Sequence, residues 1–234
     1  MLLNAQAKAA NLRTGIRGRY FFVATGLVLL GLTLVAFWDN LVTDTGQASN
    51  HDPKFIVHGL FCGAWIIVLL VQALLVTSRN VRLHRKLGAA ALLIAVGVTL
   101  STIWVFWAVW KGWAAMSPDV KANRLLLPSY SLFMAMAYLN RRRADWHKRF
   151  IYTGTLFMLD PVLGRVYDPL LVPFMTGLTE KQVDAAFLPT ILVIWLGFFA
   201  ALFAYDAVAI RRIHRVTAGA LAWFAVAWTV AFAS

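Results

Sequence analysis

Apolar residues fall in long blocks along the chain, and short polar segments separate the blocks. Apolar stretches of about 18 residues or more are typical of membrane-spanning helices, since a helix satisfies its own backbone groups in lipid. We predict an all-α bundle of seven transmembrane helices that forms one domain over residues 1–234. The predicted spans are 20–38, 55–77, 87–110, 125–139, 150–164, 188–209 and 216–233.

Two polar segments stand apart from the short connections between these spans. Residues 1–19 are basic and have no apolar core of a cleavable signal, so we expect them to form an arm before the first span. Residues 165–187 form the longest connection. In it, Thr179 and Gln182 have the spacing of a capping box, which marks the start of a helix. We therefore expect an outer loop with a short interfacial helix at 180–187.

The charge pattern predicts how the bundle is oriented in the membrane. The chain has 22 Lys and Arg residues against 10 Asp and Glu residues, and charged residues make up only 14% of it. Most of these cations lie in residues 1–19 and in the loops 78–86, 140–149 and 206–215. Cytoplasmic loops of membrane proteins carry such an excess, so the N-terminus is predicted to be cytoplasmic and Ser234 to lie on the other side. The expected partners are the bilayer and its anionic lipids, with other membrane subunits as further candidates, and no nucleic acid.

Three histidines each stand among cations at the start of a predicted span. They occur in "RNVRLHRKLG", "NRRRADWHKRF" and "IRRIHRVTAG". Because the three spans enter the membrane from the same side, the imidazoles are expected to lie at one depth and to form a ring if the helices are neighbours. The candidate cofactor-binding residues are His84, His147, His214, Arg85, Arg149 and Arg215.

Three interpretations of this histidine ring remain open. One is an anchor in the lipid head-group layer, where histidine bonds to phosphate or to a loop carbonyl. A second is a divalent metal site, because three histidines suit zinc, although the surrounding cations disfavour a dication. The third is a site for an anion or a redox cofactor. Haem b offers propionates and an iron that takes histidine ligands, and quinone offers carbonyls that accept hydrogen bonds.

Ionisable residues inside predicted spans form a second candidate site, on the outer half of the bundle. Such residues are costly in lipid and therefore indicate function. His58 lies about one turn into the second span, and Asp160 lies near the end of the fifth, followed by Arg165. We take these three as candidate catalytic residues, because a His–Asp pair in a low dielectric can relay a proton, with Arg165 or Arg124 as countercharge. The alternative is a structural ion pair of Arg165 with Asp160 or Asp168.

The stretches "HGLFCGAWIIVLLVQALLV", "LHRKLGAA", "DWHKRF" and "IHRVTAGALAW" resemble those of a group of small bacterial polytopic membrane proteins. The resemblance covers most of the chain from residue 55 onward. It implies a multi-pass, seven-helix protein of the bacterial inner membrane. In that membrane, the charge pattern predicts that Ser234 lies in the periplasm. The resemblance implies no activity.

Two classes of function follow from these features. The leading hypothesis is a membrane subunit, or a protein that binds lipid or another small ligand, with a cationic cytoplasmic face and a buried His/Asp/Arg cluster on the outer half. The alternative is a membrane enzyme. It would be either an oxidoreductase that binds haem b or quinone, or a metal-dependent hydrolase, for which zinc is the less favoured cofactor.

Overall fold

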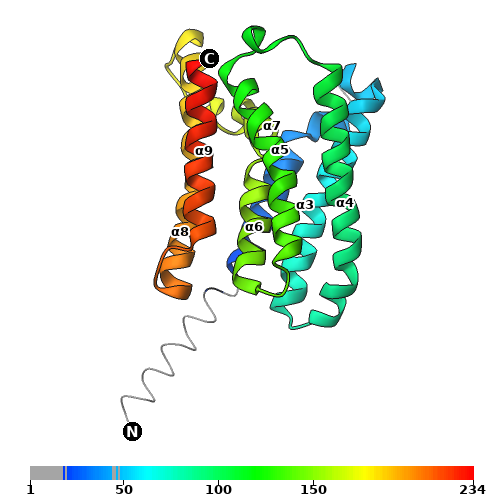
Figure 1. Cartoon of the computed structure of the whole chain (residues 1–234). Coiled ribbons are helices and arrows are strands. Elements are labelled where there is room, and N and C mark those ends of the chain that lie inside the picture. Colours follow the sequence, from blue (N-terminus) through cyan, green and yellow to red (C-terminus); the bar gives the residue numbers. More distant parts are fainter. Residues whose placement is uncertain (1–17, 19, 44–45, 47) are drawn as a thin grey trace.

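Every regular element of the described chain is a helix. The computed structural model describes residues 18, 20–43, 46 and 48–234. Its main helices are α2 (Phe21–Ala36), α3 (Pro53–Thr77), α4 (Val81–Ala108), α5 (Pro118–Leu139), α6 (Ala144–Leu156), α7 (Asp160–Leu170), α8 (Glu180–Ile210) and α9 (Arg215–Ala233). They lie side by side in a bundle (Figure 1). The predicted all-α class is confirmed for this part of the chain, whereas the predicted basic arm, except Gly18, lies outside the described residues.

Four helices are long and apolar enough to cross a membrane, namely α3, α4, α8 and α9. Large apolar side chains cover their outward faces, and Leu60, Leu93 and Val193 are 69%, 71% and 69% exposed. A soluble protein rarely exposes apolar surface on this scale, whereas lipid solvates it. These helices are those of a multi-pass membrane protein. Helix α2 is apolar but has only 16 residues.

Tight turns join α3 to α4, α5 to α6 and α8 to α9, and all three lie at the same end of the bundle (Figure 1). Arg79 and Arg211 follow α3 and α8 with φ of 64° and 56°, the left-handed conformation that ends many helices. Asn80 then starts α4, because its side chain accepts a hydrogen bond from the Leu83 N–H at 3.2 Å. We call the end formed by residues 78–80, 140–143 and 211–214 the basic end. Ser234 lies at the opposite end.

The fifth predicted span, 150–164, is two helices rather than one. Helix α6 ends at Leu156 and α7 begins at Asp160, with residues 157–159 buried between them. Pro161 has no N–H to bond the carbonyl of Phe157, four residues earlier, so a continuous helix would lose a backbone hydrogen bond here. The predicted span 150–164 is therefore not one continuous helix, and the break places backbone polar groups in the middle of the bundle.

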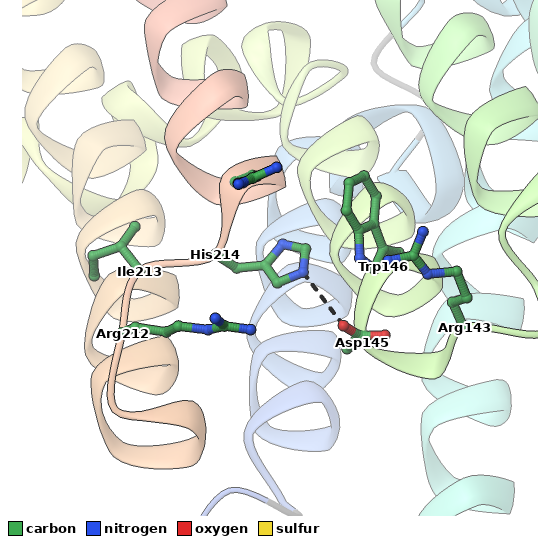
Figure 2. Close-up of a pocket in the computed structure, with 7 residues that line it drawn as sticks. Arg143, Asp145, Trp146, Arg212, Ile213 and His214 are labelled. Atoms are coloured by element: carbon green, nitrogen blue, oxygen red, sulfur yellow. Dashed lines mark ion pairs between the residues drawn. The ribbon is translucent and has the colours of Figure 1, made fainter.

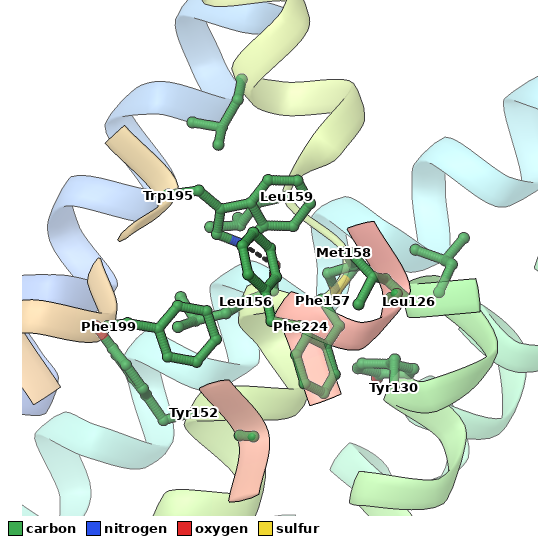
Figure 3. Close-up of a cluster of buried hydrophobic side chains, with 14 of the residues drawn as sticks. Leu126, Tyr130, Tyr152, Leu156, Phe157, Met158, Leu159, Trp195, Phe199 and Phe224 are labelled. Carbon is green, nitrogen blue, oxygen red and sulfur yellow. Dashed lines mark hydrogen bonds between the residues drawn. The ribbon is translucent and has the colours of Figure 1, made fainter. Parts of the chain in front are cut away.

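Two tryptophans donate hydrogen bonds to the end of α6 at this break. The Trp195 indole donates to the Leu156 carbonyl at 2.9 Å, and the Trp65 indole donates to Thr155 Oγ1 at 3.1 Å. Figure 3 shows Trp195 beside Leu156 and Phe224, within the largest apolar cluster of the bundle. Since lipid supplies no hydrogen-bond donors, the protein must provide them at a break of this kind.

Helix α8 also differs from the prediction. It runs without interruption from Glu180 to Ile210, so a separate interfacial helix at 180–187 is wrong. The predicted capping box is confirmed, with Gln182 Oε1 accepting from the Thr179 N–H at 2.9 Å. Pro189 lies inside α8, where it removes one backbone bond without ending the helix.

Candidate functional site

A buried ion pair joins α6 to α8 near the basic end. The side chains of Arg149 and Asp206 are both 0% exposed. Asp206 Oδ1 accepts from Arg149 Nε at 2.8 Å and also from Nη2. The third nitrogen, Nη1, donates to the Asp145 carbonyl at 2.8 Å. The guanidinium of Arg149, a predicted cofactor-binding residue, is therefore directed into the bundle, and each of its three nitrogens makes a hydrogen bond.

The second oxygen of Asp206 holds the turn between α8 and α9. Oδ2 accepts from the His214 N–H at 3.0 Å and from the Thr217 hydroxyl at 2.6 Å. His214 in turn caps α9, because its Nδ1 accepts from the Val216 N–H at 3.2 Å. One carboxylate thus fixes α6, the end of α8 and the start of α9 relative to one another.

The geometry of His214 favours a neutral imidazole. Since Nδ1 accepts a hydrogen bond, the ring proton lies on Nε2, which is 3.5 Å from Asp145 Oδ2. Burial lowers the pKa of His214, and the charge of Arg149 lowers this pKa further, while Asp145 and Asp206 oppose the change only in part. Protonation of Nδ1 would also break the cap on α9. His214 is thus a neutral donor toward Asp145.

A cavity of about 400 Å³ opens beside this network at the basic end. Figure 2 shows the side chains that surround it, from the start of α6 and from the turn between α8 and α9. Three guanidinium groups face one carboxylate there, so the cavity is positively charged. Trp146 provides an apolar wall, over which the Arg143 guanidinium lies 4.4 Å from the ring centroid. The lining residues are Arg143, Asp145, Trp146, Arg212, Ile213, His214 and Arg215.

The structure brings two of the three predicted histidines together. The ring centroids of His84 on α4 and His147 on α6 are 6.4 Å apart. His214 contacts Trp146 and Asp145 instead, and in the described chain no hydrogen bond, ion pair or ring contact joins it to the other two. The three histidines therefore do not form one ring. His84 and His147 are paired, whereas His214 lines the cavity. The predicted Arg85 is exposed in the first turns of α4, and Arg215 lines the cavity.

The candidate catalytic residues of the outer half do not form a cluster. His58 Nδ1 lies 3.1 Å from the Ser101 hydroxyl on α4. The Arg165 guanidinium lies over the Phe37 ring, 4.7 Å from its centroid. Among the described residues, no hydrogen bond or ion pair joins His58 to Asp160, and Arg165 makes no ion pair with a carboxylate. Their catalytic role stays a prediction.

Sequence reasoning gave Asp206 no part in a site, because this residue was assigned to a loop at 206–215. The signal was nevertheless present. Asp206 lies where the predicted span 188–209 and the predicted loop 206–215 overlap, and α8 continues past it to Ile210, so its carboxylate is inside a helix that is apolar on most faces. An acidic residue in such a setting needs a buried cationic partner.

No protein-family model, no curated protein and no solved structure matches this chain.

Proposed function

We propose that this is a membrane protein whose basic end binds an anionic head group, with phospholipid phosphate as the preferred ligand. The observation that carries the proposal is the cavity lined by Arg143, Arg212 and Arg215. Arginine binds phosphate through paired N–H groups and keeps its charge at every physiological pH. The Trp146 wall supports a ligand that is part polar and part apolar, since tryptophan favours the interface between lipid and water.

The position of the cavity supports a lipid as the source of the phosphate. Helices α3, α4, α8 and α9 have 25, 28, 31 and 19 residues. At 1.5 Å per residue most of them match or exceed a hydrocarbon layer of about 30 Å, so the turns between them lie at head-group level. A cationic cavity at that level meets lipid phosphates before it meets soluble anions.

We further propose seven crossings with the basic end in the cytoplasm. Helix α2 packs closely on α3, where a Cβ at Gly26 would lie 3.3 to 3.5 Å from Leu70. Helices α6 and α7 together extend from the basic end toward the opposite end, and their buried break is tolerated because protein surrounds it.

The orientation can be tested with reporter fusions. Alkaline phosphatase, which is active only outside the cytoplasm, should be active when fused after Ser234 and inactive when inserted after Arg142 in the turn between α5 and α6. The reason is that three cationic turns at one end keep that end in the cytoplasm. An inactive fusion at Ser234 would contradict the orientation, and equal activity at both sites would contradict their placement at opposite ends of the bundle.

Lipid binding can be tested by thermal unfolding of the purified protein in detergent. A ligand that binds only the folded state raises the midpoint of unfolding. We expect phosphatidylglycerol to raise it, and phosphatidylcholine to have little effect. The double variant Arg212→Gln, Arg215→Gln should lose the response, because two of the three guanidinium groups in the cavity are gone.

The matched control is Arg82→Gln, Arg142→Gln. It removes the same charge from the basic end, at two exposed positions that do not line the cavity. If both double variants lose the response equally, the effect is general surface charge and the cavity is not the site. Inorganic phosphate is tested alongside, and a full response to it without lipid would make the free anion, rather than the lipid, the ligand.

A further inference from the structure

His84 and His147 face each other at the basic end, and each is the fourth residue of its helix. Their ring centroids are 6.4 Å apart, and the ring planes meet at 87°. A metal–nitrogen bond is about 2 Å long, and each nitrogen lies about 1 Å from the centre of its ring, so two imidazoles on opposite sides of one ion have centroids about 6 Å apart. The observed spacing fits an ion between the two rings.

One ring is held by the main chain, and the other has a buried nitrogen without a partner. His147 Nδ1 lies 2.9 Å from the Ala137 carbonyl, which places a proton on Nδ1 and leaves Nε2 with a free lone pair. The His84 Nδ1 atom is buried without a hydrogen-bond partner. Histidines that bind metals typically donate one N–H to a carbonyl, because this fixes the tautomer and the direction of the ring.

Gln72, on α3, also has buried polar atoms without partners. Both side-chain amide atoms of Gln72 are buried without partners, as is His84 Nδ1. Such atoms are rare in native proteins, and each one calls for an explanation such as a bound ion.

The cations next to His147 in the sequence are directed away from the pair. Lys148 Nζ donates to the Tyr205 hydroxyl at 2.6 Å, and Arg149 donates to Asp206, so both turn toward α8. Arg85, which directly follows His84, is exposed. The repulsion that the sequence suggested for a bound cation is therefore reduced, and it is smallest for an ion with a single charge.

We propose that His84 and His147 bind one univalent copper ion between them. Copper forms strong bonds to imidazole. Zinc, by contrast, takes four ligands, and the described part of the chain holds no group of three or more His, Cys, Asp or Glu side chains that could bind a metal. The site does not include any residue that lines the arginine cavity, so the copper proposal does not depend on lipid binding.

The test is a competition for copper(I) between the purified full-length protein and the coloured chelator bicinchoninate, with ascorbate as reductant. The native protein should take one copper ion per chain. His84→Gln and His147→Gln should each weaken binding about 100-fold, because one ligand cannot hold the ion alone. His51→Gln is the matched control, since His51 is exposed in the Ala48–His51 turn and should leave binding unchanged.

Several outcomes would overturn the proposal. One is copper binding that persists in both histidine variants, and another is zinc(II) displacing copper at the same two residues. A third is a haem Soret band in the native protein that disappears in His84→Gln, which would make the ligand a haem iron. Thermal unfolding without copper serves as the folding check. If His147→Gln does not fold because it loses the bond to Ala137, the His84→Gln result decides.

Discussion

Asp206→Asn is expected to lower the free energy of unfolding by about 3–5 kcal/mol, the cost of leaving one charge of a buried pair without its partner. Arg149 and Asp206 are both fully buried, so water cannot solvate the guanidinium of Arg149 once its carboxylate partner is gone. The loss should also loosen the turn between α8 and α9, because the same carboxylate accepts from His214 and Thr217. The measurement is unfolding in mixed detergent micelles by added dodecyl sulfate, followed by circular dichroism.

A second substitution separates the charge from the shape. In Arg149→Met, Asp206→Asn the charge is removed from both sides, and the amide oxygen can still accept from Thr217. This double variant should be more stable than Asp206→Asn alone, since the two residues are directly coupled. The control is Asp145→Asn, whose side chain is 53% exposed and which should cost less than about 1 kcal/mol. Equal losses for Asp206→Asn and Asp145→Asn would show that the buried pair does not stabilise the bundle.

The sequence predicts the helices of this bundle better than it predicts their contacts. Apolar blocks mark helices reliably because lipid leaves the backbone few alternatives. The break at residues 157–159 falls just before Pro161, within what the sequence predicts as one span, 150–164. Whether a helix bends or stops there depends on donors from elsewhere in the chain, and here Trp195 supplies one from α8. Such a partner, far away in the sequence, cannot be predicted from local pattern.

The candidate site shows the same limit. Three histidines with the same sequence context were predicted to share a ring, yet His84 and His147 are paired while His214 caps α9. The sequence shows which cations stand next to these histidines. It does not show where each cationic side chain is directed, because that depends on which helix lies opposite. Arg149 has Asp206 opposite it, so it is buried, whereas Arg215 lines the cavity. In a bundle that is apolar on nearly every face, periodicity does not show which helices are neighbours.

Trp195→Ala should lower the free energy of unfolding by about 3–5 kcal/mol, the range measured when a buried tryptophan is removed from a core. The Trp195 side chain is 0% exposed, and its ring centroid lies 5.0 Å from that of Phe224. Trp195→Phe keeps most of this packing but removes the N–H that bonds the Leu156 carbonyl. It should therefore cost less, about 1–3 kcal/mol, the cost of a buried acceptor that loses its donor.

The comparison of these two variants isolates what the indole N–H does at the break between α6 and α7. The control is Trp107→Phe on α4, where the ring is 80% exposed and the substitution should change the unfolding free energy by less than about 0.5 kcal/mol. Circular dichroism is the appropriate signal, because every variant removes a tryptophan. If Trp195→Phe behaves like Trp107→Phe, the Leu159 N–H, 3.2 Å from the same carbonyl, is sufficient, and Trp195 contributes through packing alone. If Trp195→Phe is costly, the broken helix depends on a hydrogen-bond donor from α8.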